Sequence, residues 1–332
     1  MQVPFTRNTH EMKKNNIVRI VEALKSLGMA TKAHLAQHTG LSVATCGAVL
    51  NRLCERHQVQ ELQRDASSGG RPAQRYACNP DYYAQLALYV EGSDEAARIV
   101  WSVNSAVGSK LAEGEGDFLP LTLETFDRQI ATLLAAYPAI RAAGIGMPGV
   151  VAEGTVLTCD VTLFEHIDII AHLHRQHGLF VHADNDMNYT VWGFYRSQAA
   201  QIDAPVAYLY FPGVACAGCG MVINGNVVRG ASHFAGEVSH LIDPHQPALK
   251  LAEEVALMLT SLTAIVNPAR VAVCGPQLSA PLIAEAEAIC ARRIPQRHRP
   301  EILFRTSRRD DYLLGITEQL TQAYLHHDIF HD

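Results

Sequence analysis

Two polar side chains that could bind hydroxyl groups lie in the run Asp184-Asn-Asp-Met-Asn188. An apolar stretch before the run predicts a strand, and residues 187–196 predict a helix after it. Asn185 and Asp186 would therefore offer one amide and one carboxylate at a strand-to-helix junction, and a carboxylate can accept hydrogen bonds from two hydroxyl groups. The alternative is that Asp184 and Asp186 only cap the helix.

Two glycine-rich stretches accompany this run. Gly144-Ile-Gly-Met-Pro-Gly149 predicts a buried strand that ends in a glycine turn. Gly218-Cys-Gly-Met-Val-Ile-Asn-Gly225 begins a hairpin with an Asn-Gly turn, and residues 229–240 follow that hairpin directly. Strand hairpins mixed with helices of crossover length predict an α/β body.

The chain is long enough, at 332 residues, for two or three domains. We expect an N-terminal head at residues 1–78, a first lobe of the body at residues 79–200 and a second lobe at residues 201–332. The last helix of the chain is expected to pack back on the first lobe.

The head carries the signals of two short helices joined by a tight turn. Thr31 would cap the first helix and Gly40 would end it, and Ser42 would cap the second helix. Two helices joined by a turn with a glycine form the helix-turn-helix pattern. The second helix has small or hydrogen-bonding residues away from its apolar side, which suits the major groove of DNA. The candidates for DNA contact here are Ser42, Thr45, Asn51 and Arg52.

Two short strands, predicted at residues 59–62 and 74–77, would complete the head as a winged helix-turn-helix. The tip of the wing would be Gly69-Gly-Arg-Pro72. Gly70 would allow a close approach to the DNA backbone, and Arg71 would place a guanidinium in a narrow minor groove. The alternative is a small helical subdomain that binds no DNA.

The distribution of charge favours DNA binding by the head. Residues 1–76 hold eleven Lys or Arg against five Asp or Glu, a net charge of +6. The whole chain has a net charge of −6, so the remainder carries −12. A basic head on an acidic body indicates that the head meets phosphate and the body does not.

The composition points to an ordinary globular protein of the cytoplasm. Apolar residues make up 48% and charged residues 18% of the chain, and no run of about 18 apolar residues predicts a membrane span. The N-terminus has no signal-peptide core. Eight scattered cysteines, mostly in apolar runs, are expected to be reduced thiols.

Together, the stretches at 144–149, 184–188 and 218–240 resemble the ROK family, the sugar kinases and sugar-responsive repressors of the actin-like ATPase superfamily. The turn Thr39-Gly-Leu-Ser42 and the wing at 69–72 resemble the winged helix that the repressor branch adds. The resemblance covers most of the chain and implies a two-lobed actin-like body with a sugar site between the lobes. The ligand contacts that it implies are Asn185, Asp186, Glu237, His240 and Gly149.

Two glycine loops depart from the kinases of this family. The phosphate-binding loop, an Asp followed by Gly-Gly-Thr-like residues, corresponds here to Glu91-Gly-Ser-Asp-Glu95, and three carboxylates there would repel ATP. The second loop, Thr-Gly-Ile-Gly-Ala-Gly in the family, is Ala215-Cys-Ala-Gly-Cys-Gly220 here, where Cys216 would crowd a position that needs no side chain. Kinase activity is therefore not expected.

The cysteine loop that holds a structural zinc in the family is missing. Residues 241–247 follow His240 here, and no cysteine comes before Cys274. A His without thiolates at suitable spacing is not a zinc site, so neither a metal nor a cofactor is expected. The lost loop also removes a Glu that completes the sugar pocket of the family.

The sequence therefore predicts a DNA-binding transcriptional regulator, a repressor of sugar metabolism genes that responds to a sugar or sugar derivative. Its expected partners are a double-stranded DNA operator, a sugar effector and a second copy of the chain. One alternative is a sugar kinase with an appended DNA-binding head. Another is an interaction-only dimer module without a ligand.

Overall fold

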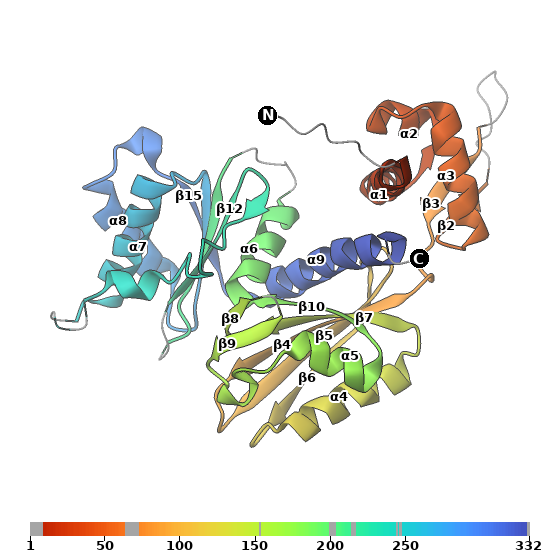
Figure 1. Cartoon of the computed structure of the whole chain (residues 1–332). Coiled ribbons are helices and arrows are strands. Elements are labelled where there is room, and N and C mark those ends of the chain that lie inside the picture. Colours follow the sequence, from red (N-terminus) through yellow and green to blue (C-terminus); the bar gives the residue numbers. More distant parts are fainter. Residues whose placement is uncertain are drawn as a thin grey trace, which may run out of the picture.

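The computed structural model describes residues 9–63, 73–152, 154–198, 204–213, 217–243, 245 and 248–330. The predicted wing tip, with Gly70 and Arg71, lies outside these residues, and so does Cys216. The described chain forms a small head at its N-terminal end and two lobes, each built on a five-stranded sheet (Figure 1). We call the lobe with the first sheet lobe 1 and the other lobe 2.

The head contains three helices and a three-stranded antiparallel sheet of strand order β1-β3-β2. The predicted caps are confirmed: Thr31 accepts from the amide of His34, Ser42 accepts from the amide of Thr45, and Gly40 ends its helix with φ +69°. The elements are α1 (Thr9–Leu27), β1 (Ala30–Thr31), α2 (Lys32–Thr39), α3 (Val43–Glu55), β2 (Val59–Leu62) and β3 (Arg75–Cys78).

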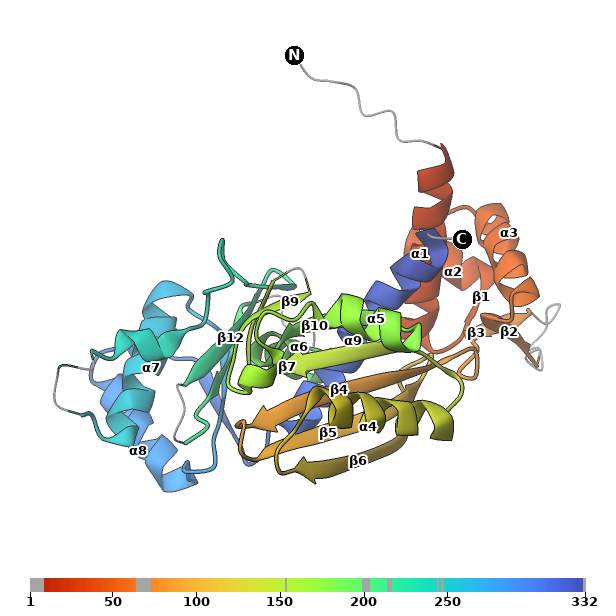
Figure 2. The same ribbon diagram turned by 60° about the horizontal axis from the view of Figure 1, so that its bottom comes forward.

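Lobe 1 is a mixed sheet of strand order β10-β7-β4-β5-β6, covered on one face by helices α4 and α5 (Figure 2). A two-stranded hairpin, β8–β9, follows β7. The elements are β4 (Ala84–Gly92), β5 (Ala97–Ser105), β6 (Lys110–Phe118), α4 (Leu123–Ala136), β7 (Ile140–Met147), β8 (Gly149–Ala152), β9 (Thr155–Cys159), the 3₁₀ turn η1 (Thr162–Phe164), α5 (Ile169–His177) and β10 (Phe180–Asn185).

Lobe 2 repeats the strand topology of lobe 1. Its order is β13-β12-β11-β14-β15, with parallel pairs on one side of β11 and antiparallel pairs on the other, just as β4 divides the first sheet. The elements are β11 (Val206–Tyr210), β12 (Gly218–Ile223), β13 (Asn226–Val227), η2 (Val238–Leu241), α7 (Leu251–Ile265), β14 (Arg270–Cys274), α8 (Ala280–Ala291), η3 (Gln296–His298) and β15 (Glu301–Arg305).

Two helices, α6 (Asp186–Ser197) and α9 (Arg309–Phe330), run between the lobes (Figure 1). Both pack on the face of the first sheet opposite α4 and α5, and α6 also packs against the second sheet. They cross at Gly193 and Gly315, where a Cβ atom would lie 1.7 Å from the carbonyl oxygen of Asp311 and 1.8 Å from that of Tyr189. Only glycine allows the two backbones to come this close.

Some elements differ from what the sequence indicates. The last helix is longer than the helical spacing of residues 312–326 indicates, and it spans Arg309–Phe330. The strand β6 was not predicted, because its Lys, Glu and Gly residues lack the apolar pattern of a buried strand; it is an edge strand, which needs no such pattern. The strand β15, also at a sheet edge, was not predicted either.

Across the described residues, no helix is long and apolar enough to cross a membrane.

We expect Gly315→Ala to lower the melting temperature strongly, because its methyl group would collide with the backbone of α6, and overpacking of this kind costs at least ~2 kcal/mol. Gly47→Ala is the matched control, since the nearest atoms to its new methyl belong to the flexible end of Lys32 at 3.6 Å. Ala is favoured over Gly in a helix by about 1 kcal/mol, so the control should be neutral or stabilising. Thermal melts of both variants decide this, and equal melting temperatures would contradict the tight crossing.

Candidate functional site: a cleft between the lobes

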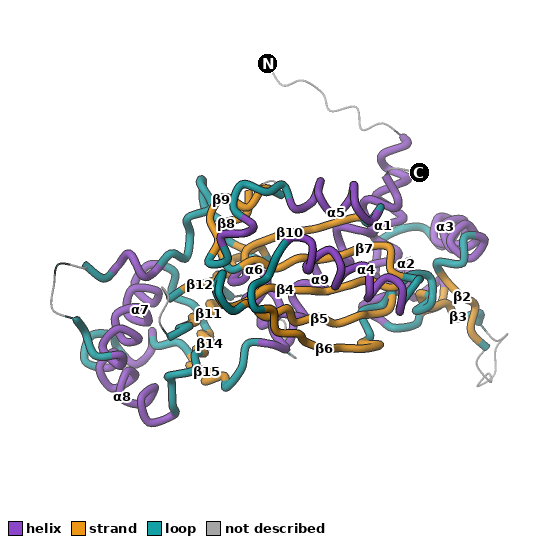
Figure 3. The backbone as a smooth tube through the Cα atoms, turned by 90° about the horizontal axis from the view of Figure 1, so that it is seen from below, coloured by secondary structure: helices purple, strands orange, loops and turns teal. Residues whose placement is uncertain are grey.

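A cleft of about 1020 Å³ lies between the two lobes. Its lining includes residues at the carboxyl ends of β4, β7 and β10 of lobe 1 and of β11 of lobe 2. Figure 3 shows the backbones of the two sheets side by side. In open α/β sheets, ligands bind at the carboxyl ends of parallel strands. The topology of both sheets therefore places this cleft where a binding site is expected.

Asn185 holds the floor of the cleft in place. Its side-chain oxygen accepts from the amides of Met187 (2.7 Å) and Asn188 (3.1 Å), so Asn185 is the N-cap of α6. Its side-chain amide donates to the carbonyl oxygen of Gly149 (2.7 Å), which ties α6 to the start of β8. The cap of this helix is therefore Asn185, the residue between the two aspartates, although Asp186 also accepts from the amide of Met187 at 2.8 Å.

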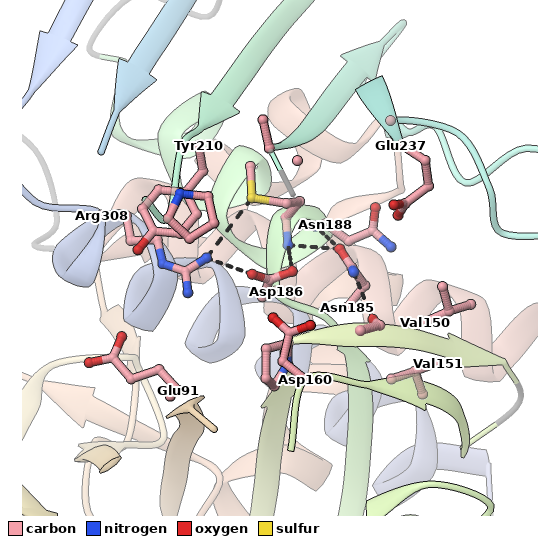
Figure 4. A pocket seen from close by; sticks show the side chains of 18 of the residues that line it. Glu91, Val150, Val151, Asp160, Asn185, Asp186, Asn188, Tyr210, Glu237 and Arg308 are labelled. Atoms are coloured by element: carbon pink, nitrogen blue, oxygen red, sulfur yellow. Dashed lines mark hydrogen bonds and ion pairs between the residues drawn. The ribbon is translucent and has the colours of Figure 1, made fainter. Parts of the chain in front are cut away.

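Asp184 and Asp186 have different surroundings. Asp184 is buried, accepts from the side-chain amide of Asn188 (2.8 Å), and forms an ion pair with Arg229. Asp186 is the first residue of α6 and lines the cleft (Figure 4). Asp184 therefore stabilises neighbouring residues of the cleft, Asn188 and Arg229, whereas Asp186 faces the space in which a ligand would lie.

Arg308 is the partner of Asp186, and the sequence analysis did not identify it. Its Nη1 donates to one carboxylate oxygen of Asp186 at 2.6 Å, and the other oxygen accepts from the amide of Met187 at 2.8 Å. The guanidinium is 7% exposed and lies over the ring of Tyr210, 3.9 Å from its centroid. The only sequence signal for Arg308 is the charged run 305–311 at the start of the last helix.

The electrostatics of this pair keep Arg308 charged. Burial alone would lower the pKa of its guanidinium, but the carboxylate of Asp186 and the phenols of Tyr210 and Tyr312 raise that pKa above its usual value. Its Nε is buried, and among the described residues it has no acceptor. Arg308 thus retains hydrogen-bonding capacity that Asp186 does not use.

Two further carboxylates, Asp160 and Glu237, lie on either side of Asp186 (Figure 4). No hydrogen-bond or ion-pair partner for either carboxylate is found in the described part of the chain. Burial in the cleft, followed by the charge of Asp186, raises the pKa of both carboxyl groups. The cleft therefore offers two unpaired acceptors close to the Asp186–Arg308 pair, which suits a ligand rich in hydrogen-bond donors. Asp160 was not among the predicted site residues.

The structure brings most, but not all, of the predicted ligand contacts together. Asn185, Asp186, Glu237 and Gly149 line the cleft. His240 does not: it is exposed, and its ring lies against Phe234 with centroids 5.1 Å apart.

The predicted DNA contacts lie on or beside α3 of the head. Asn51 and Arg52 are exposed, as the recognition surface of a helix-turn-helix requires. Thr45 is partly exposed. The hydroxyl of Ser42 accepts from the amide of Thr45 as the helix cap, and it lies 2.8 Å from the hydroxyl of Thr45. Ser42 therefore has less hydrogen-bonding capacity left for DNA.

The loop between β4 and β5 has little to offer a phosphate group. The amides of Ser93 and Ala96 are bonded to each other's carbonyl oxygens across the turn. Asp94 accepts from the amide and hydroxyl of Thr162, at 2.6 and 2.8 Å. Glu91 lines the cleft and adds a negative charge. Phosphate sites of the P-loop kind depend on free backbone amides, and two of the amides of this turn are already bonded within it.

The described residues contain no group of three or more His, Cys, Asp and Glu side chains arranged to hold a metal ion. The seven described cysteines are free thiols, and five of them are buried. The absence of a structural zinc stays a prediction.

In comparison with protein families, residues 120–250 of the chain match the ROK family. Among curated proteins, it is similar to the xylose repressor of Bacillus subtilis (strain 168), with 25% identity over 242 residues, covering 70% of this chain and 61% of the relative. The xylose repressor of Caldicellulosiruptor bescii is 21% identical over 238 residues, covering 69% of this chain and 59% of the relative. The chain thus spans about three fifths of the length of these relatives.

Solved structures confirm the predicted α/β fold. A ROK family transcriptional regulator, described as a homolog of the E. coli MLC protein, superposes with a TM-score of 0.73 at 15% identity, covering 97% of this chain and 100% of that one. A ROK hexokinase from Thermus thermophilus superposes with a TM-score of 0.60 at 18% identity, covering 74% of this chain and 99% of the other. The regulator matches nearly the whole chain, and the hexokinase matches about three quarters of it.

We expect Glu237→Gln to raise the melting temperature at pH 7, on the order of 1–3 °C. Because the folded state raises the pKa of this carboxyl group, ionisation destabilises the fold as pH rises through that pKa, and the isosteric amide removes the penalty. The gain should shrink as pH falls toward 4, where the parent carboxyl group is protonated. Thermal melts across pH 4–8 measure this. The control is Glu124→Gln, at an exposed glutamate. A gain in melting temperature that does not change with pH would contradict a raised pKa of Glu237.

Proposed function

We propose that this chain, which matches the ROK family over residues 120–250, is a DNA-binding transcriptional repressor whose cleft binds a sugar or sugar derivative. The observation that carries the proposal is the combination of two sites in one chain. The head presents the exposed polar residues Asn51 and Arg52 on a capped helix, and the body has an open cleft with unpaired carboxylates. The names of the relatives, which are xylose repressors, support the same function.

The geometry of the cleft argues against phosphoryl transfer. A catalytic base has to accept the proton of the attacking hydroxyl group, but each oxygen of Asp186 already accepts one hydrogen bond, one of them from a guanidinium, so the hydroxyl group would have to share or displace a bond. The loop that would hold the phosphates uses the amides of Ser93 and Ala96 for its own turn. We therefore propose that the chain has lost kinase activity while keeping the cleft, although kinases share its fold.

A homodimer is part of the proposal. One recognition helix contacts only a few base pairs, and two heads related by a two-fold axis double the sequence that is read. A ligand that binds one arrangement of the lobes more tightly would shift the population toward it, and so change the separation of the heads. Binding of the ligand and binding of the operator would then be linked.

We expect the full chain to bind double-stranded DNA with an affinity that falls steeply between about 50 and 200 mM salt, because each phosphate contact releases counterions. Arg52→Ala should weaken binding to a preferred sequence by ~1–3 kcal/mol, the range for one good base contact. The matched control is Arg128→Ala, at an exposed helical arginine of lobe 1 that pairs with Glu124. Fluorescence anisotropy measures both, and salt-independent binding, or equal loss in the two variants, would refute a role for α3.

We expect a neutral sugar to stabilise the chain in thermal-shift assays by an amount set by its concentration relative to its dissociation constant. The panel should start with D-xylose, for which the relatives are named, and include amino sugars and sugar phosphates. Asp186→Asn should abolish the shift, whereas Asp81→Asn, an exposed aspartate outside the cleft, should preserve it.

ATP with magnesium, run in the same assay, distinguishes the kinase alternative, because a kinase would be stabilised by its nucleotide. If neither a sugar nor a nucleotide binds below millimolar concentration, the interaction-only dimer is the better description.

A further inference from the structure

The helix α9 connects the cleft to the head. It begins at Arg309, immediately after Arg308, and it ends at Phe330, which packs against the head (Figure 1). Its 22 residues span about 33 Å without a proline. Its glycine, Gly315, is enclosed by the crossing with α6. A continuous helix of this kind moves as a unit rather than bending.

The end of α9 near the head is fixed by contacts from several head elements. Ile329 is buried in the core of the head, with Leu24, Leu35 and Leu50. Lys14 of α1 donates to the carbonyl oxygen of Phe330 at 2.8 Å. These contacts make the last turn of α9 part of the head.

Polar contacts at the α3–β2 turn strengthen this connection. Asp328 accepts from the side-chain amide of Gln58 at 2.5 Å, and Arg56 lies 4.0 Å from the same carboxylate. The same Gln58 amide donates to the hydroxyl of Tyr82, in the segment that leads from the head into lobe 1. A displacement of α9 would therefore reach both α1 and the turn that follows α3.

The opposite end of α9 depends on the cleft. Arg308 is held by a hydrogen bond to Asp186, by a longer one of 4.0 Å to the sulfur of Met187, and by its position over the rings of Tyr210 and Tyr312. A sugar hydroxyl is both a donor and an acceptor, so it can enter between a carboxylate and a guanidinium and satisfy both. Neither buried charge is then left unpaired, which keeps the cost of opening the pair low.

We propose that the Arg308–Asp186 ion pair is the switch through which the cleft controls the head. A neutral ligand with adjacent hydroxyl groups enters the pair and separates Arg308 from α6, and α9 transmits the displacement to the α1–α3 packing. The ligand step rests on the proposed function, but the coupling of the pair to the head does not. The coupling is a property of the chain alone, and variants without any ligand test it.

The test is hydrogen–deuterium exchange of the full chain, with variants that break the pair from opposite sides. Arg308→Gln and Asp186→Asn should each increase exchange in the last turn of α9 and in residues 55–62, by about five- to 150-fold, the usual range of coupling between sites. Asp186→Asn leaves the stacking of Arg308 on Tyr210 in place, so agreement between the variants assigns the effect to the ion pair. The double variant should show no more than either single one, because both break the same contact.

Two controls separate coupling from general loss of structure. Arg196→Gln removes an exposed ion pair with Glu318 in the middle of α9, and it should leave the head unchanged. Ile329→Ala removes a side chain at the head end of α9 that is buried in the head. In this background, Arg308→Gln should cause no further increase of exchange in the head. The proposal is overturned if the exchange increase stays within the cleft, if α7 and α8 are affected equally, or if Arg196→Gln has the same effect.

A sugar that stabilises the chain in the thermal-shift assay allows one further exchange experiment. It should reproduce the exchange pattern of Arg308→Gln in the parent chain, and binding without any effect on the head would overturn the switch. If no sugar binds, the sensor part of the proposed function fails, while the variants still decide whether the ion pair and the head are coupled.

Discussion

The buried guanidinium of Arg308 requires a negatively charged partner. It pairs with the carboxylate of Asp186, which lies 122 positions earlier in the chain. The ion pair of Arg308 and Asp186 lies where the N-terminal ends of α6 and α9 meet at the cleft. A buried pair of this kind contributes little net stability, because desolvation cancels most of the attraction, but removing one partner is costly. The pair therefore links the starts of α6 and α9, the two helices that run between the lobes.

The rest of the architecture follows from these two helices. Each lobe is a five-stranded sheet of the same topology, and α6 packs against both sheets. The carboxyl ends of β4, β7, β10 and β11 lie at the cleft, where the carboxylates of Asp160 and Glu237 have no partner among the described residues. One molecule thus combines an open cleft with a head whose core includes Ile329, at the other end of α9.

Local patterns in the sequence predicted the local structure, but they could not predict contacts between segments that are far apart in the sequence. Thr31 and Ser42 are caps because of short-range hydrogen bonds, and the turn at Asn224-Gly225, with φ of +51° and +70°, needs only its own two residues. The family resemblance placed Asn185, Asp186 and Glu237 in one cleft, but it also placed His240 there, which the structure does not. Arg308 and Asp160 were missed because their roles arise only when the lobes come together. The repeated sheet topology was missed because strand order does not need a repeated sequence.

The central claim is that the head reads DNA as one half of a two-fold pair while the body senses a ligand. Selection of operators by the full chain from a pool of random double-stranded DNA tests it most directly. The account predicts enrichment of one sequence with two inverted half-sites, a whole number of helical turns apart. Recovery of no enriched sequence, or of a single half-site, would contradict it.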